Sequence, residues 1–140
     1  MRKISIVPIF VIFIMLASSC SQTKTENLTL SFDTNGNYMG FASISEIYTP
    51  EQAIKDGCYV SSNLELVGGE QSWEKFLQSA TDGKDASIRI MSIYDDDNAV
   101  YYEDLYYIKG NYQIFDSSSE DLSEHTYKYL LDLRGRSLRR

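Results

Sequence analysis

The chain has 140 residues, of which 43 % are hydrophobic and 24 % are charged, a composition that excludes a wholly disordered chain and a multi-span membrane protein. Two cysteines exclude a disulfide-dense mini-protein, and a single histidine argues against a histidine-rich metal site. The formal net charge of −7 argues against nucleic acid as a partner, because its phosphates would be repelled.

The first twenty residues have the order of an export signal. After a basic start, residues 4–16 form a mostly apolar run, shorter than the roughly 20 residues a helix needs to cross a membrane. Small residues at 17–19 and then Cys20 follow, an order that resembles the lipobox of bacterial lipoproteins. The resemblance implies a signal peptide over residues 1–19, lipid attachment at Cys20, and a place at the extracytoplasmic face of the cell membrane. The alternative is an ordinary secretory signal and a soluble protein.

Residues 20–44 are expected to form either a tether or an N-terminal hairpin. Residues 28–32 alternate apolar and polar side chains, as a half-buried strand does, and the Asn-Gly pair within 33–37 favours a tight turn. Residues 38–42 would then return as a second strand. The other interpretation is a flexible tether that reaches to about residue 44.

A globular α+β domain is predicted over residues 45–133, and its first element is a short helix at about 50–56. Thr49 is a good N-cap, Pro50 suits the first helical position, and Gln52 completes a capping box. Gly57 is placed to end the helix in a left-handed conformation.

A principal amphipathic helix is predicted at about 70–81. Four apolar residues recur there at helical spacing, namely Trp73, Phe76, Leu77 and Ala80. We expect this stripe to lie in the hydrophobic core, where the helix packs on a sheet.

The remainder of the domain is predicted to form an antiparallel meander of about four to five strands. Apolar alternation and tyrosine-rich runs indicate strands at 59–60, 87–94, 99–108, 112–115 and 125–133, the last of which also fits a helix. Gly110-Asn111 is typical of a type II′ hairpin turn, whereas 61–69 is expected to be a loop. One face of such a sheet can stay wet. Residues 134–140 are expected to be a basic, solvated tail, or else a weak contact to a polyanion.

The sequence offers no catalytic motif, and we expect no catalytic, cofactor-binding or metal-binding residues. His125 has no motif around it, and Cys58 is expected to be a buried, inert thiol. The acidic run at 95–98 lacks the spacing of a calcium loop and is interpreted as a solvated turn. Eleven tyrosines include the pairs at 101–102 and 106–107, where alternate rings should face the core and the outside.

Residues 48–133 resemble a family of small bacterial lipoproteins defined by a domain of unknown function (DUF4362). The order of the matching pieces carries the resemblance: Tyr48-Thr49-Pro50-Glu51-Gln52-Ala53 with Gly57, Trp73-Glu74-Lys75-Phe76-Leu77, Ser87-Ile88-Arg89-Ile90, Asp104-Leu105-x-Tyr107 and Asp116-Ser117-Ser118. It implies an exported lipoprotein and supplies no activity.

The function expected from the sequence is a non-catalytic binding or interaction domain, held at the membrane by its lipid, with a protein or wall polymer as partner. One alternative is a small hydrolase of cell-wall or extracellular polymer that uses carboxylates; two close carboxylates in one pocket would favour it. The other is a secreted enzyme inhibitor, for which the segments 61–69 and 116–121 are candidate loops.

Overall fold

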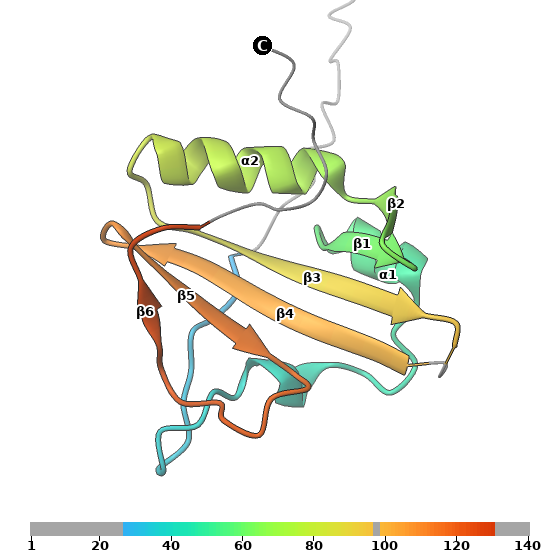
Figure 1. The fold of residues 1–140 in the computed structure, drawn as a ribbon, viewed down its shortest axis with the longest axis horizontal. Coiled ribbons are helices and arrows are strands. Elements are labelled where there is room, and N and C mark those ends of the chain that lie inside the picture. The colour runs from blue at the N-terminus through green and yellow to red at the C-terminus, as the bar shows by residue number, and fades with distance from the viewer. Residues whose placement is uncertain (1–26, 97–98, 131–140) are drawn as a thin grey trace, which may run out of the picture.

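A computed structural model describes residues 27–96 and 99–130. It contains one mixed six-stranded sheet with two α-helices, in the sheet order β2-β1-β3-β4-β5-β6 (Figure 1). The elements are a 3-10 turn η1 (Gly40–Ser43), α1 (Pro50–Lys55), β1 (Tyr59–Ser62), β2 (Glu65–Gly68), α2 (Glu70–Thr81), β3 (Ala86–Tyr94), β4 (Ala99–Ile108), β5 (Asn111–Asp116) and β6 (Thr126–Tyr127).

The α+β class and both helices are confirmed, but the purely antiparallel meander of four to five strands is wrong. β1 pairs in parallel with β3, with Tyr59 opposite Ile90 and Ser62 opposite Ile93, while the other strand pairs are antiparallel. Parallel neighbours need a long connection. Here β2 and α2 supply it, since they carry the chain away from β1 and back to the sheet (Figure 1).

Two tight turns differ from the sequence-based expectation. Residues 61–69 form the β1–β2 hairpin in place of a loop, and Asn63 and Leu64 at its tip have φ of 48° and 70°. The β4–β5 turn uses Lys109 and Gly110, with φ of 48° and 81°, one residue earlier than the predicted pair. Positive φ at both central residues is the type I′ geometry, whose twist matches that of the strands.

The short helix α1 has the caps that the sequence predicts. The side chain of Thr49 accepts a hydrogen bond from the Gln52 amide at 3.2 Å, and Gly57 follows the helix at φ 90°. The helix α2 is instead preceded by Gly69 in the left-handed region, where a Cβ atom would overlap the Cys58 carbonyl group. Glycine is therefore required between the hairpin and α2.

The main core lies between α2 and one face of the sheet. The predicted stripe is confirmed, because Trp73, Phe76 and Ala80 are buried and Leu77 packs beside them. Trp73 stacks on Phe76 with ring centroids 5.8 Å apart. The sheet contributes Ile88, Ile90 and Leu105 to this cluster.

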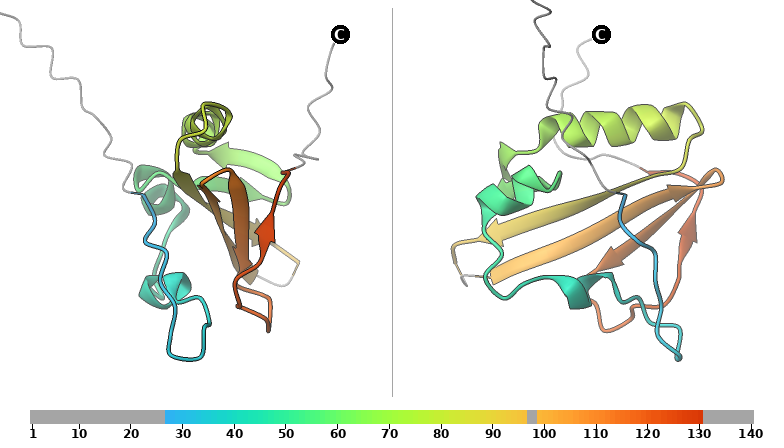
Figure 2. Two further views of the ribbon diagram at one scale, coloured as in Figure 1. Left: turned by 90° about the vertical axis from the view of Figure 1, so that its left-hand side faces the viewer. Right: turned by 180° about the vertical axis from the view of Figure 1, so that it is seen from behind.

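The opposite face of the sheet is covered by residues 28–44, which we call the N-terminal strap (Figure 2). Tyr38 stacks on Phe115 with ring centroids 4.0 Å apart, and Phe32 packs edge-on against both rings. Phe32 and Tyr38 also form an isolated antiparallel bridge around the turn at 33–37. Neither face of the sheet is therefore wholly wet, in contrast to the expectation for a simple meander.

The last predicted strand is much shorter than expected. Within 125–130 only Thr126–Tyr127 form a strand, which pairs with β5 at the far edge of the sheet. The predicted signal peptide at 1–19, the predicted lipid attachment at Cys20 and the predicted basic tail at 134–140 lie outside the described residues. Among residues 27–96 and 99–130, no helix has the length and apolar character needed to span a membrane.

Candidate functional site

Beneath the strap lies a buried ion pair. Asp104, with no exposed surface, accepts two hydrogen bonds from the guanidinium of Arg89, at 2.6 Å to Oδ1 and 2.5 Å to Oδ2. The Tyr38 hydroxyl donates to the same carboxylate at 2.5 Å and lies 2.7 Å from the Tyr106 hydroxyl, and Arg89 also donates to the Gly40 carbonyl. These contacts complete the hydrogen bonding of the pair and fasten the strap, so we assign the network a structural role.

Burial raises the pKa of both tyrosines in this network. The pKa of Tyr106 rises to about 12, chiefly because its phenol is desolvated, and the nearby Asp104 carboxylate adds to the shift. The pKa of Tyr38 rises further, because desolvation is joined by its hydrogen bond to Asp104. Both phenols are therefore proton donors at physiological pH, and neither is a base.

Cys58 is buried, as predicted, and lines a cavity of about 390 Å³ together with Tyr48, Asp56 and Arg89. Its sulfur lies 3.6 Å from the Tyr48 hydroxyl, which donates to Asp56 at 3.0 Å. Desolvation raises the pKa of the Cys58 thiol. Since the thiolate is the nucleophile, this environment suits an inert thiol.

His125 lies in an exposed loop with Asp121 and Ser123. Its Nε2 atom is 3.0 Å from Asp121 and 3.3 Å from the Ser123 hydroxyl, and that hydroxyl donates to the same Asp121 side chain. A catalytic triad uses the two ring nitrogens separately, one toward the acid and the other toward the serine. Here the Nε2 atom of His125 contacts both the acid and the serine, so these contacts are side-chain hydrogen bonds within one loop and do not form a triad.

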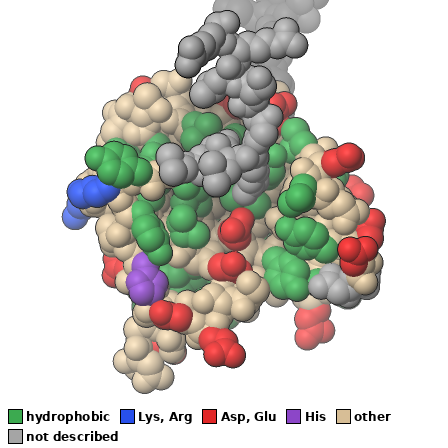
Figure 3. Space-filling model, in the orientation of Figure 1, with side chains coloured by type: hydrophobic (Ala, Val, Ile, Leu, Met, Phe, Trp, Pro, Cys, Tyr) green, Lys and Arg blue, Asp and Glu red, His purple; other side chains and the backbone are tan. Residues whose placement is uncertain are grey.

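The open half of the α2-side sheet face holds a cavity of about 270 Å³, lined by Tyr94, Tyr101, Glu103 and Asp116 together with Ser92 and Ser118. Glu103 and Asp116 are opposite each other in the β4–β5 register, and the two tyrosine rings meet edge-to-face at 5.9 Å. Figure 3 shows acidic side chains among hydrophobic ones on this face. The cavity thus combines aromatic surface with two carboxylates, which the sequence does not bring together.

Three exposed apolar side chains lie close together in sequence on the β1–β2 hairpin. Leu64 at its tip is 83 % exposed, and Leu66 and Val67 on β2 are 46 % and 50 % exposed. β2 is the edge strand of the sheet, and the register shift between Val60 and Ser61 places a bulge in it. Bulges protect edges from indiscriminate strand pairing, so side chains are the main binding surface here.

The hairpin is held rigidly. Asn63 donates from its side chain to Asp95 at 2.7 Å, accepts from the Asp95 amide at 3.2 Å, and its own amide donates to the Ile93 carbonyl at 2.9 Å. The tip is thereby tied to the end of β3. Leu64, next in the chain, is presented to solvent by a fixed backbone.

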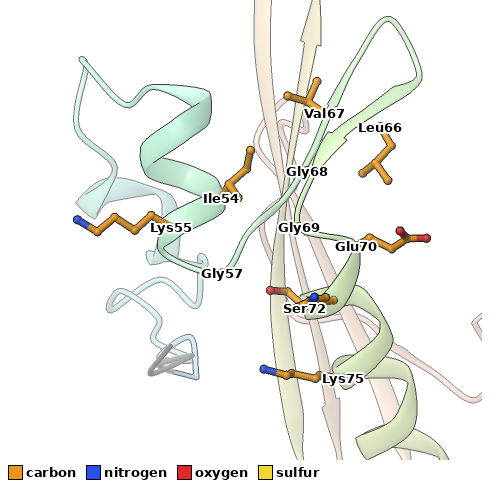
Figure 4. Close-up of a pocket in the computed structure, with 11 residues that line it drawn as sticks. Ile54, Lys55, Gly57, Leu66, Val67, Gly68, Gly69, Glu70, Ser72 and Lys75 are labelled. Atoms are coloured by element: carbon orange, nitrogen blue, oxygen red, sulfur yellow. The ribbon is translucent and has the colours of Figure 1, made fainter. Parts of the chain in front are cut away.

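A groove of about 480 Å³ runs beside the hairpin, between α1, β2 and the start of α2 (Figure 4). Its apolar lining is Ile54, Leu66 and Val67, and Gly68 allows Ile54 to pack against β2, because a Cβ there would meet its side chain. Lys75 extends from α2 toward α1, while Glu70 points to the other side of α2 (Figure 4). The hairpin and this groove together form the surface that we call the hairpin site.

Sequence reasoning offers 61–69 as a candidate loop of an enzyme inhibitor, but it misses the hairpin that this segment forms and the groove beside it. A signal was present, since Asn63 suits the first position of a type I′ turn and Glu-Leu-Val follows with strand-forming side chains. The tyrosine pairs have rings on both faces of the sheet: Tyr106 is buried under the strap, and Tyr101 lines the cavity on the open face.

Within the described residues, no group of three or more histidine, cysteine, aspartate or glutamate side chains is arranged to hold a metal ion. Asp95, in the acidic run, is engaged with Asn63.

Comparison with known proteins found no match: no family model, no curated protein and no solved structure is similar to the chain. The resemblance to the DUF4362 lipoproteins therefore stays a prediction.

Proposed function

We propose that the protein is a non-catalytic interaction domain that binds a protein partner through the hairpin site. We also propose that it is held at the extracytoplasmic face of the cell membrane by lipid on Cys20. The export proposal rests on the order of charges, apolar residues and cysteine at the N-terminus. The binding proposal rests on the structure of the hairpin.

One observation carries the binding proposal, namely the conformation of Leu64. A bulky side chain with φ of 70° is unfavourable by about 1–2 kcal/mol, and asparagine or glycine would relieve it. The Leu64 side chain is 83 % exposed, so its apolar surface contributes little to the stability of the folded protein. A residue that costs stability and solubility at a rigid tip is well suited to fill a pocket on a partner, with little ordering required on binding.

The test is site-specific photo-crosslinking on intact cells. A photoreactive amino acid replaces Leu66 in the full chain, and the control carries it at Tyr129, which is 86 % exposed and follows β6 at the opposite edge. We expect a discrete crosslinked protein from position 66 and none of that mass from position 129. The further change Leu64→Gly should remove the crosslink. Equal products from both positions, or a product that survives Leu64→Gly, would contradict the proposal.

A second candidate function, hydrolysis by carboxylates, is favoured by the cavity that holds Glu103 and Asp116. Glycoside hydrolases commonly use two carboxylates that flank the scissile bond, and Glu103 and Asp116 line one cavity as register partners. The assay is release of soluble fragments from peptidoglycan by the purified chain, with Glu103→Gln and Asp116→Asn as variants and His125→Gln as the control. Turnover that the first two changes abolish and the third retains would establish this function in place of pure binding.

A further inference from the structure

We infer that the hairpin site selects an acidic protein segment, whose apolar side chains lie on Leu66 and Val67 and whose carboxylates approach Lys75. This inference rests on the proposed binding function and names the chemistry of the partner. It follows from the contrast between the charge of the groove and the charge of the molecule.

The groove reverses the sign of the protein around it. The whole chain has 20 acidic and 13 basic residues, yet the groove is lined by two lysines and one glutamate. In Figure 4 Lys75 extends across the groove, whereas Lys55 on the outer side of α1 and Glu70 on the far side of α2 both point away from it. A partner carboxylate in the groove therefore meets the Lys75 ammonium group first.

The lysines of the groove are available to a partner. Lys84 is paired with Asp82 and Arg89 with Asp104, whereas neither Lys55 nor Lys75 forms an ion pair with a carboxylate of the described residues. Both are exposed on helices that pack on the sheet, so binding a carboxylate requires no change of fold.

The charge of the groove affects a bound segment more than the net charge of the whole protein does. At physiological ionic strength the Debye length is about 8 Å, so acidic residues on other faces of the protein are largely screened from the groove. The Lys75 ammonium group remains within contact range of a bound segment. An acidic partner is therefore accepted at the hairpin site although the protein as a whole is acidic.

The groove also sets the form of the partner. Apolar lining from Ile54, Leu66 and Val67 lies in the same groove as Lys75, so an ion or a highly charged polymer would leave this surface uncovered. A segment that alternates apolar and acidic side chains covers both parts. The bulge in β2 limits backbone pairing to a short stretch, which leaves side chains to determine the choice.

The experiment is an NMR titration of the full lipidated chain in detergent with three capped peptides. They alternate valine with glutamate, with glutamine or with lysine. We expect the glutamate peptide to bind roughly three- to tenfold more tightly than the glutamine peptide, and this advantage to shrink at high salt. Lys75→Gln should remove the advantage. The matched control Lys128→Gln, an exposed lysine beside β6, makes the same charge change and should leave it intact.

The outcomes separate the two proposals. Equal binding of the three peptides, or a preference for the glutamate peptide that Lys75→Gln leaves unchanged, overturns the selection for acidic segments. If Leu64→Gly still abolishes peptide binding in either case, the hairpin remains the docking surface. Binding of the glutamate peptide that Leu64→Gly leaves unchanged counts against the proposed function itself. No binding of the glutamate peptide at millimolar concentration overturns the inference. The crosslinking experiment then remains the test of whether the hairpin binds a partner protein.

Discussion

At the residue scale, Leu64 combines a strained backbone with an exposed side chain. A single substitution there should therefore raise the stability of the fold and abolish partner binding. Leu64→Gly produces an Asn-Gly pair, the preferred sequence for the type I′ turn seen here. We expect the free energy of unfolding to rise by about 1 kcal/mol while partner binding is lost. Chemical denaturation checks the first effect and crosslinking the second. A loss of stability would mean that Leu64 supports the fold, and the binding role would lose its main argument.

Trp73 is the residue whose removal should weaken the domain most directly. It is only 8 % exposed and packs between α2 and the sheet with Phe76 and Tyr59. Trp73→Ala should cost roughly 3–5 kcal/mol, a large part of the ~5–15 kcal/mol that holds a small domain folded. The measurement is the thermal midpoint by circular dichroism. A midpoint within a degree or two of that of the unmodified protein would show that the packing of α2 contributes little.

At the scale of elements, the strap and the sheet are joined by a buried charge pair whose partners cannot be removed singly without cost. Asp104→Asn leaves the guanidinium of Arg89, which is largely buried, without its counter-charge, and the expected loss is about 3–5 kcal/mol. Asp82→Asn is the control, since it breaks a solvent-exposed pair with Lys84, and such pairs contribute little to stability. Urea unfolding compares the two. Similar losses of unfolding free energy in both variants would show that the buried pair contributes no more to stability than the exposed one.

The same network makes the strap sensitive to alkali. The pKa of Tyr106 is about 12 in the folded protein, against roughly 10 in an unfolded chain. Between these values the unfolded state releases the proton first, so stability is full below pH 10 and falls as the pH rises toward 12. The expected loss is roughly 2–3 kcal/mol by the upper end. Tyr106→Phe should flatten this fall in denaturation curves, and an equally steep fall in that variant would assign it to other groups.

At the scale of the whole molecule, local sequence patterns predict the elements that form from neighbouring residues. The stripe at Trp73 and Phe76 identifies α2, and the apolar alternation at Ile88 and Ile90 identifies β3. Both patterns follow from the residue spacing within a single helix or strand. The cap of α1 is equally local, since Thr49 and Gln52 are three residues apart.

The features that the sequence does not reveal depend on contacts between distant residues. Tyr38 and Asp104 are 66 positions apart, and Arg89 between two isoleucines has the pattern of an outward-facing residue until the strap covers it. The parallel pairing of β1 with β3 likewise depends on where α2 packs, which no local period encodes. The hairpin site shares this origin, since its groove forms only where α1, β2 and α2 meet.

Location is a property of the whole chain, and it is tested at Cys20. Cys20→Ala should leave the protein without lipid and shift it from the membrane fraction to uncleaved or soluble forms, because acyl chains supply the anchoring energy. Mass spectrometry and cell fractionation measure both effects. Unchanged mass and unchanged membrane retention in the variant would refute the lipid anchor.

The amide of Leu28 donates to the Ser87 hydroxyl at 2.8 Å, so the strap is already fastened to β3 eight positions after Cys20. Eight extended residues span at most about 28 Å, whatever path they take. The proposed lipid on Cys20 would therefore hold Leu28 within that distance of the bilayer surface. Under this proposal the partner is a membrane protein or a molecule that reaches the membrane surface, and the outer layers of a thick cell wall lie beyond the reach of the domain.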